Sequence, residues 1–357
     1  MSDRVFTLPI VIEDVECVTE CWTHNRMAVL KTSPYYEDWI ASRYNIYTTS
    51  QFNFRFGETW MYTPDYYDPI LVSRPVQLFS MTVSNIVEKM KKELGNGYYL
   101  NMMIKPYRDR ERIHEVVFYG YNDEEKLFYA IGIKGHIFQK QVFSYEYMEE
   151  MLPLLQEHLR RREQRGMELS LQYQYPVYAF KMREDYSTDN CAFYAYKKIS
   201  DELNGAILHK HTRNTSGAYE MNTKVYRGIA CLDGLIDMIH KILAGEEMEP
   251  GYQGVAIAVR KLYEHRRMML ISMQYVLRKW ENAMKPETGK WINRYEECCE
   301  VVQKWVNMAI KYQLTQNEEL LRKIEVEVSE VYEREHNVLE QFINTSIDWD
   351  EFNRCYI

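Results

Sequence analysis

Two residues that can perform acyl chemistry together, a cysteine and a histidine, stand where the local pattern begins a regular element. Cys21 precedes the run Ala28-Val29-Leu30 and is expected to open a helix. His114 begins an alternating segment that continues to Tyr121, which is typical of a strand. A helix N-terminus carries roughly half a positive charge, and an adjacent imidazole can take a proton. The pair therefore predicts a thiol nucleophile activated to attack an acyl carbon.

The same residues also permit an unreactive thiol. A lone cysteine on an apolar helix is more often a small core residue than a nucleophile. Four acidic residues precede the helix: Glu13, Asp14, Glu16 and Glu20. Carboxylates around the helix start would favour the protonated thiol. A structural Cys21 and a catalytic Cys21 are both compatible with this segment.

Four segments carry a wider pattern. Residues 114–124 read His-Glu-Val-Val-Phe-Tyr-Gly-Tyr-Asn-Asp-Glu, and Cys21 is followed seven to nine residues later by a small residue and two aliphatic ones. The other two are Tyr226-Arg227-Gly228-Ile229 and the stretch from Lys311-Tyr312 through 320–324 to Tyr332-Glu333-Arg334-Glu335. With these segments the chain resembles the family of butirosin biosynthesis protein H, papain-like cysteine-peptidase homologues of bacterial natural-product gene clusters. Cys17 does not fit the family's spacing.

The resemblance implies an α+β, papain-like cysteine-peptidase fold followed by an all-α helical bundle. It implies Cys21 as nucleophile and His114 as base in an acyltransferase that forms amides. The acyl or peptidyl group would come from the thioester of an acyl or peptidyl carrier protein and pass to a small-molecule amine. Such a reaction belongs to nonribosomal antibiotic biosynthesis, including pathways of the closthioamide kind.

One position departs from the family pattern. Gly132 stands where the family commonly has an aspartate that orients the histidine. This departure leaves three possibilities open: a Cys-His dyad, a different orienting residue, or lost chemistry. Two other functions accordingly stay beside the acyltransferase, a cysteine peptidase or amidase that uses water as acceptor, and a noncatalytic binding scaffold.

Composition narrows the class of protein. The 357 residues are 46% hydrophobic with a net charge of −8, so a sizeable core is expected and nonspecific nucleic-acid binding is not. No apolar run is long enough to span a membrane, and the seven unevenly spaced cysteines suit reduced thiols, so we expect a cytoplasmic protein. Neither a Gly-rich phosphate loop nor a zinc-ligand set occurs, and we expect no cofactor or metal. The basic run 158–165 is typical of a solvated helix face, with docking of an acidic partner as the alternative.

The apolar periodicity divides the chain into two expected domains. Residues 1–182 should form the α+β domain that carries the Cys/His site, with helices at 22–31, 82–94 and 144–165. Its strands are expected at 98–104, 114–121, 127–134 and 137–143, followed by short strands at 169–173 and 177–181, whereas 35–75 should hold aromatic-rich strands and loops. Residues 183–357 should form the bundle, with helices at 188–203, 223–244, 254–283, 291–314 and 316–343 and an exposed loop at His209-Lys210-His211.

Overall fold

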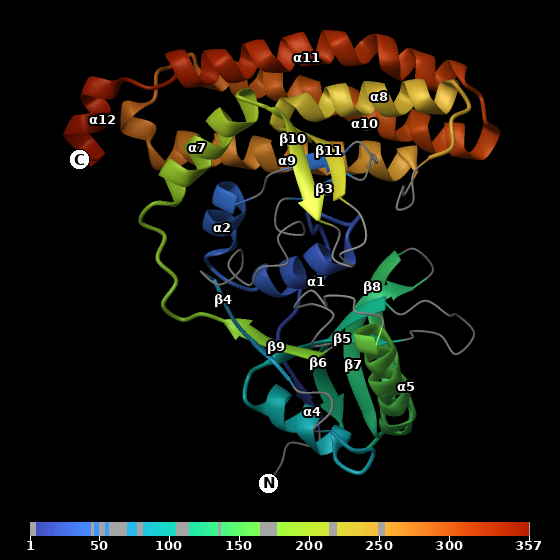
Figure 1. Cartoon of the computed structure of the whole chain (residues 1–357). Coiled ribbons are helices and arrows are strands. Elements are labelled where there is room, and N and C mark those ends of the chain that lie inside the picture. Colours follow the sequence, from blue (N-terminus) through green and yellow to red (C-terminus); the bar gives the residue numbers. More distant parts are fainter. Residues whose placement is uncertain are drawn as a thin grey trace. The chain divides into compact units, whose positions relative to one another are not determined.

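The computed structural model divides the chain into two compact units (Figure 1). It describes residues 5–43, 46–49, 54–56, 70–76, 81–104, 114–134, 137–164, 177–213, 220–248 and 254–356. The sheet unit comprises Met1–Tyr36, Tyr62–Tyr186 and Asn214–Tyr219, and the helical unit comprises Glu37–Met61, Ser187–Arg213 and Glu220–Ile357. Residues 37–61, which the sequence expectation placed in the first domain, thus belong to the second unit.

The sheet unit is built on an antiparallel sheet of seven strands. These strands are β1 (Val5–Thr7), β4 (Leu71–Pro75), β5 (Tyr99–Ile104), β6 (His114–Asn122), β7 (Leu127–Lys134), β8 (Ile137–Ser144) and β9 (Val177–Met182). Their order is β4-β9-β5-β6-β7-β8, and β1 adds to β6. The mixed α+β class is confirmed.

The β6–β7 hairpin forms from the two alternating runs that were predicted to be strands. Val116 pairs with Gly132 and Phe118 with Ala130, and a register shift between Phe118 and Gly120 separates these pairs from the pairing of Asn122 with Leu127. At the turn, the side-chain oxygen of Asn122 accepts hydrogen bonds from the backbone N–H groups of Glu124 and Glu125, at 3.0 and 3.2 Å. Such a side-chain-closed turn is what an Asn-Asp segment favours.

Helices cover both faces of this sheet. Helices α4 (Ile86–Gly95) and α5 (Tyr145–Gln164) pack on the face that presents Val116, Phe118 and Ala130 and form a hydrophobic core with it. Helix α1 (Cys21–Leu30) lies on the opposite face, where it contacts Phe138 and Phe180. Strand alternation explains the division, because neighbouring residues of a strand point to opposite faces.

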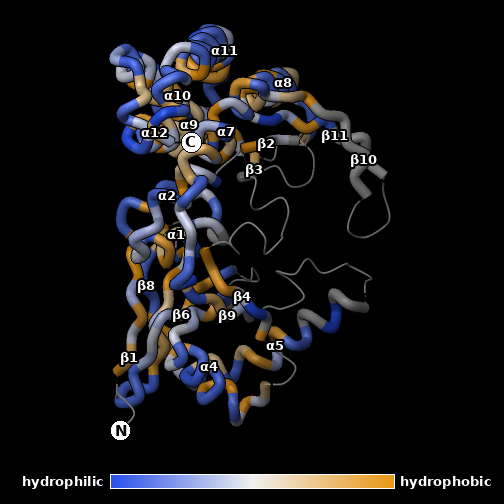
Figure 2. The backbone as a smooth tube through the Cα atoms, turned by 90° about the vertical axis from the view of Figure 1, so that its left-hand side faces the viewer, coloured by the Kyte–Doolittle hydropathy of each residue, from blue (hydrophilic) through white to orange (hydrophobic). Residues whose placement is uncertain are grey.

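The helical unit consists mainly of long helices that share one core. Its helices are α2 (Tyr36–Arg43), α7 (Cys191–Leu203), α8 (Cys231–Leu243), α9 (Val255–Lys279), α10 (Thr288–Thr315), α11 (Glu319–Thr345) and α12 (Trp349–Tyr356), with the 3-10 turns η3 (Gly228–Ala230) and η4 (Glu281–Ala283). Figure 2 shows hydrophobic and hydrophilic residues alternating along the coils of α8 and α11, as expected for helices buried on one side.

This unit is not the all-α bundle that was predicted. It also holds a four-stranded sheet of β2 (Ile46–Thr49), β3 (Arg55–Phe56), β10 (Ile207–Arg213) and β11 (Glu220–Arg227), in the order β10-β11-β2-β3. The predicted loop at His209-Lys210-His211 is part of β10, and the start of the helix predicted at 223–244 is part of β11. Helix α2 replaces an expected strand or loop, and the strand expected at 169–173 lies outside the described residues.

The remaining helix predictions agree with the structure to within a few residues at their ends. Helices α5, α7, α9, α10 and α11 occupy the predicted stretches, whereas α12 was not predicted. Among the described residues, no helix combines the length and apolarity that crossing a membrane requires.

Candidate active site

Both candidate residues open the elements predicted for them. Helix α1 begins at Cys21, and strand β6 begins at His114. The side chains of Cys21 and His114 lie outside the described residues, so the site is built from their backbones and their described neighbours. The first turn of α1 leaves backbone N–H groups without helical partners at Cys21, which is the arrangement that favours an anion there.

The turn that follows Cys21 is polar and completely buried. Four successive residues, Thr23, His24, Asn25 and Arg26, are each at most 4% exposed. Thr23 donates to the Glu20 carboxylate at 3.4 Å, and the guanidinium of Arg26 lies 5.6 Å from the ring centre of Phe180. Burying polar side chains costs free energy unless each finds a partner, so these contacts hold the helix in one position on the sheet.

Asn25 connects the helix to the beginning of β6. Its side-chain Nδ2 donates to the backbone carbonyl of Glu115 at 3.4 Å. Asn25 lies one helical turn beyond Cys21, and Glu115 is the neighbour of His114. The Glu115 carboxylate in turn accepts a hydrogen bond from the Asn101 amide of β5, and all three side chains are buried. The starts of α1 and β6 are thereby held side by side.

His24 ties α1 to the segment that leads into it. The ring stacks on Phe138 with 3.6 Å between centroids, and Nδ1 lies 3.0 Å from the Cys17 carbonyl oxygen. Because a carbonyl only accepts, Nδ1 carries the proton and donates it, which leaves Nε2 as a bare acceptor. Burial lowers the pKa of His24 to about 4, although the bond to the Cys17 carbonyl favours the charged ring.

This burial predicts an acid sensitivity of the sheet unit. Between pH 6.5 and pH 4 the unfolded chain binds a proton that folded His24 does not, so the stability held above pH 6.5 falls as the pH is lowered, by about 3 kcal/mol in total. A His24→Gln variant should lack this component. Hydrogen exchange of the α1 and β6 peptides at pH 7 and pH 4.5 checks it, and equal losses of protection in variant and wild type would contradict it.

The acidic residues before α1 are distributed differently from the expectation. Glu16 lies 3.6 Å from Lys31, the residue that follows α1, and the Lys31 ammonium also donates to the Asp14 carbonyl. The backbone N–H of Val11 bonds to Ala28, so the segment runs along the C-terminal half of the helix. Of the four acids, only Glu20 is shown beside Cys21. The predicted crowding of carboxylates at the helix start is therefore wrong for Glu16.

Two glycines of the hairpin are required by close approach of other groups. A Cβ at Gly120 would lie 2.4 Å from the Phe6 carbonyl oxygen of β1, which explains glycine in the Tyr-Gly-Tyr segment. A Cβ at Gly132 would lie 2.7 Å from a methyl group of Val116 and 3.1 Å from the Gln141 amide nitrogen. An aspartate does not fit at position 132 unless the neighbouring strand side chains move.

The turn residues of the hairpin are bound elsewhere. Asp123 accepts from the Tyr145 hydroxyl at 2.8 Å and pairs with Lys91 at 2.9 Å, and these partners lower the pKa of Asp123 although desolvation opposes them. Asn122 closes the turn itself. Since both lie at the far end of β6 from His114, neither supplies the orienting acid in this register.

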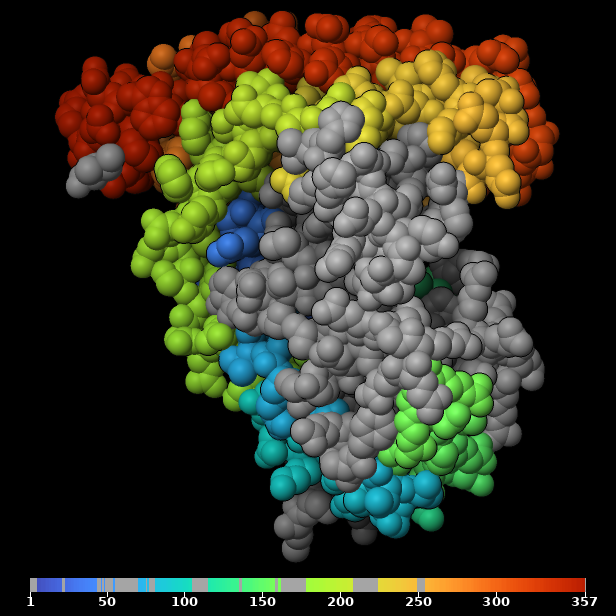
Figure 3. Space-filling view, in the orientation of Figure 1, coloured from blue at the N-terminus to red at the C-terminus, as the bar shows by residue number. Residues whose placement is uncertain are grey.

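The basic segment of α5 agrees with a solvated helix face. Arg160 and Arg161 pair with Glu157 at 3.9 and 2.8 Å, and both arginines are more than half exposed. Figure 3 shows the side chains of α5, coloured green, on the surface of the sheet unit. These pairs leave the alternative of a docking patch without specific support.

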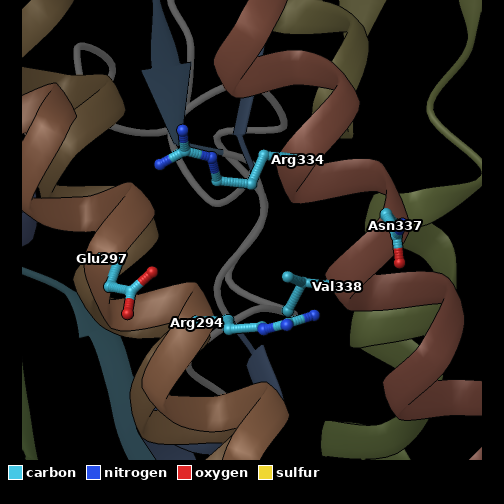
Figure 4. A pocket seen from close by; sticks show the side chains of 5 residues that line it. All are labelled: Arg294, Glu297, Arg334, Asn337 and Val338. Atoms are coloured by element: carbon cyan, nitrogen blue, oxygen red, sulfur yellow. The ribbon is translucent and has the colours of Figure 1, made fainter.

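A groove of about 210 Å³ lies between α10 and α11 (Figure 4). It is lined by Arg294, Glu297, Arg334, Asn337 and Val338. Arg334 already pairs with Glu330 at 2.6 Å. Glu297 in the lining supplies a second negative charge, so the charges of the two arginines are balanced. The groove therefore has no electrostatic preference for an anion, and we assign it no role.

A second set of titratable groups is buried within the helical unit. Arg266 of α9 pairs with Glu335 of α11 at 3.0 Å, and the Tyr295 hydroxyl donates to the same carboxylate at 2.9 Å. His265 lies 3.5 Å from Glu202 of α7. Burial raises the pKa of Glu202 to about 8 and lowers that of His265, so at neutral pH the proton resides on the carboxyl group and the ring is neutral.

Sequence reasoning missed Asn25, Glu115 and Asn101. Their signal was weak but present, since a run of four polar residues interrupts an otherwise apolar helix and a glutamate follows the candidate histidine.

Among the described residues, no group of three or more histidine, cysteine, aspartate or glutamate side chains is arranged to hold a metal ion. No protein-family model matches the chain, and no curated protein matches it significantly.

Proposed function

We propose that this protein is a cysteine-dependent acyltransferase that forms an amide. The acyl or peptidyl group would move from a carrier-protein thioester to a small-molecule amine in the biosynthesis of a nonribosomal antibiotic. The observation that carries the proposal is the Asn25–Glu115 contact, which brings the helix that begins at Cys21 against the strand that begins at His114. The resemblance of residues 114–124 to the butirosin biosynthesis protein H family supports the choice of reaction.

The chemistry proceeds in two balanced steps. The Cys21 sulfur attacks the thioester carbonyl while His114 takes the thiol proton, and the carrier thiolate leaves with that proton, so one C–S bond forms and another breaks. The amine then attacks the acyl-enzyme, His114 accepts a proton from the nitrogen, and Cys21 leaves as the thiol. The Cys21 backbone N–H at the helix start is available to stabilise the oxyanion of both intermediates.

The papain-like architecture and a cytoplasmic location are parts of the same proposal. A thiol enzyme of this kind needs reduced cysteines and a carrier protein in its compartment. A helix that begins at the cysteine and packs on an antiparallel sheet whose strand begins at the histidine is the arrangement that a papain-like site requires. Transfer, as opposed to hydrolysis, additionally requires that the amine binds and that water is kept away.

A noncatalytic binding scaffold is the second candidate, and Gly132 favours it. At the position where the family pattern has the orienting acid, a Cβ would lie 2.7 Å from a Val116 methyl group, so a side chain fits there only if its neighbours move. A chain that has lost the acid and filled its space can keep the fold and bind an acylated carrier protein without reacting. A cysteine peptidase or amidase has no observation of its own in the structure.

Intact-protein mass spectrometry separates these functions. The protein is incubated with an acyl carrier protein charged with an acetyl, hexanoyl or benzoyl group, with and without a primary amine. An acyl adduct on the protein and an amide that forms only with the amine support the proposal. An adduct that yields free acid at the same rate with or without amine indicates hydrolysis, and binding without an adduct indicates a scaffold. Cys21→Ala is the control.

The relative reactivity of the cysteines can be measured before that experiment. We expect a limiting amount of iodoacetamide to label Cys21, because the other described cysteines except Cys355 are buried. Burial also raises the pKa of Cys298 to about 12 and holds that of Cys231 well above its usual value, which suppresses their thiolates. Labelling should be done in a Cys355→Ser background, since Cys355 is exposed and would compete. Peptide mapping that finds the label on Cys17 would contradict the assignment.

A further inference from the structure

We infer that Glu202 of α7 and His265 of α9 form a buried pair that holds one proton, which keeps α7 packed at neutral pH and loosens it when mild alkali removes that proton. Both residues belong to the helical unit. Neither takes part in the proposed acyl transfer, so this pH-sensitive device is independent of that function.

Helix α7 buries one side only, and its C-terminal half places an amine and a carboxyl group there. The Lys198 ammonium donates to the Ile40 carbonyl of α2 at 3.4 Å. Glu202 is 2% exposed, and its Oε2 lies 3.5 Å from Nε2 of His265, which is completely buried. The packing of α7 therefore depends on the charge of Glu202. The buried residues recur at the spacing of one helical face: Cys191, Ala195, Lys198, Ile199 and Glu202.

The contacts of the pair favour two neutral groups over an ion pair. Within the described part of the chain, Nδ1 of His265 and Oε1 of Glu202 have no hydrogen-bond partner. A buried ion pair offsets the desolvation of its charges only when further hydrogen bonds satisfy both partners. A carboxyl group that keeps its proton beside a neutral imidazole carries no charge, so it avoids that cost.

The groups around the pair also oppose a charge on the imidazole. Burial lowers the pKa of His265, and the nearby cations Arg266 and Lys198 lower it further. The anion on this side is Glu335 of α11, which already pairs with Arg266 at 3.0 Å. The other titratable groups that face Glu202 stay neutral because burial raises their pKa values: Tyr295 of α10 and Cys231 of α8.

One proton changes its place when this unit folds. In the unfolded chain between pH 4.5 and 6.5, the carboxyl group is ionised and the imidazole carries the proton. In the folded chain, burial raises the pKa of Glu202 to about 8 and lowers that of His265. Folding thus moves the proton from the nitrogen to the oxygen, and the number of bound protons stays the same.

This transfer determines the pH profile of α7. Between pH 4.5 and 6.5 the two shifts cancel, because the folded chain gains a proton on Glu202 and lacks one on His265. Above pH 6.5 the imidazole is neutral in both states, and only the folded chain holds the carboxyl proton. The equilibrium for opening α7 should therefore rise roughly tenfold per pH unit, or on the order of 30-fold between pH 6.5 and 8.

Hydrogen exchange of the α7 peptides in the full chain, expressed as protection factors from pH 4.5 to 8.5, tests this profile. The wild type should keep its protection up to pH 6.5 and lose about 30-fold by pH 8. Glu202→Gln keeps the size and a hydrogen-bond donor but cannot ionise. This variant should keep its protection above pH 6.5 and lose roughly tenfold per unit below it, where nothing offsets the shift of His265.

Asp201→Asn is the matched control, because Asp201 is an exposed carboxylate next to Glu202 and pairs with Lys197 at 2.6 Å. Its profile should follow that of the wild type. His265→Gln should lose protection over the whole range from pH 4.5 to 8, since only the shift of Glu202 remains. An equal fall above pH 6.5 in the wild type and Glu202→Gln would overturn the inference. A His265→Gln profile that is constant below pH 6.5 would do the same.

Infrared spectroscopy locates the proton directly. The difference between the wild type and Glu202→Gln at pH 6.5 should contain the carbonyl band of a protonated carboxyl group, and this band should vanish by pH 9. Its absence at pH 6.5 would show that Glu202 is ionised and that the pair does not hold the proton. If Glu202→Gln does not fold, spectra of the wild type at pH 6.5 and pH 9 are compared instead, with the same two outcomes.

Discussion

Replacing His114 by alanine is expected to lower acyl transfer by roughly 10²-fold or more while leaving the fold nearly unchanged. The imidazole is proposed to take the proton of the Cys21 thiol and later that of the amine, so both steps lose their base. Position 114 is the first residue of β6 and pairs there with Ile104. A side chain at the end of a strand contributes less to packing than one at its centre, which limits the effect on stability.

Single-turnover decay of the acyl carrier protein thioester measures this loss. His240→Ala provides the matched control, because His240 is an exposed histidine of the helical unit that pairs with Glu325 at 2.6 Å. Its rate should equal that of the wild type. Turnover of the His114 variant at the wild-type rate, with protection from hydrogen exchange unchanged in β6, would remove His114 from the mechanism.

The local sequence pattern was sufficient to predict the helix and the strands that carry the candidate site. The alternation of residues 114–121, an Asn-Asp turn and a second alternating run predict a hairpin without long-range information. The ladder through Val116 and Gly132 agrees with that prediction. The long helices α9, α10 and α11 could also be predicted, because apolar residues recur with a period of 3.6 over many turns in each of them.

The small sheet of the helical unit could not be predicted from local sequence pattern. Its central pairing joins Val225 of β11 to Thr49 of β2, which are far apart in the sequence. Nothing in either short segment indicates its partner, and the helical pattern that follows β11 extends across its boundary. Helix α12 did have a local signal, since the Asp348 carboxylate accepts from the N–H groups of Asp350 and Glu351, as an N-terminal cap does.

The candidate site shows the same division. Cys21 and His114 were found because their types and their places at element starts are visible in sequence. The bond from Asn25 to Glu115 was not, since it exists only after the helix has packed on the sheet. The four polar residues 23–26 did indicate that this turn is not ordinary core, but they could not show which of them reaches β6.

The second large effect is expected in the helical unit, where Glu335→Leu should lower the free energy of unfolding by about 3–5 kcal/mol. Arg266 and Glu335 are completely buried, and removal of the carboxylate leaves the guanidinium charge without its partner. Tyr295 loses its acceptor in the same variant. Glu202 can compensate only in part, because burial keeps it protonated at neutral pH. The deficit relative to the wild type should therefore shrink as the pH rises toward 8.

Hydrogen exchange of the α9, α10 and α11 peptides measures this change within the unit concerned. Glu330→Leu is the matched control on the same helix, since its pair with Arg334 is exposed and should contribute at most about 1 kcal/mol. The double variant Arg266→Met with Glu335→Leu should regain most of the loss, because an apolar pair replaces two charges that had to be desolvated. Wild-type stability of Glu335→Leu, or a double variant less stable than the single one, would show that Arg266 is not held as an ion by Glu335.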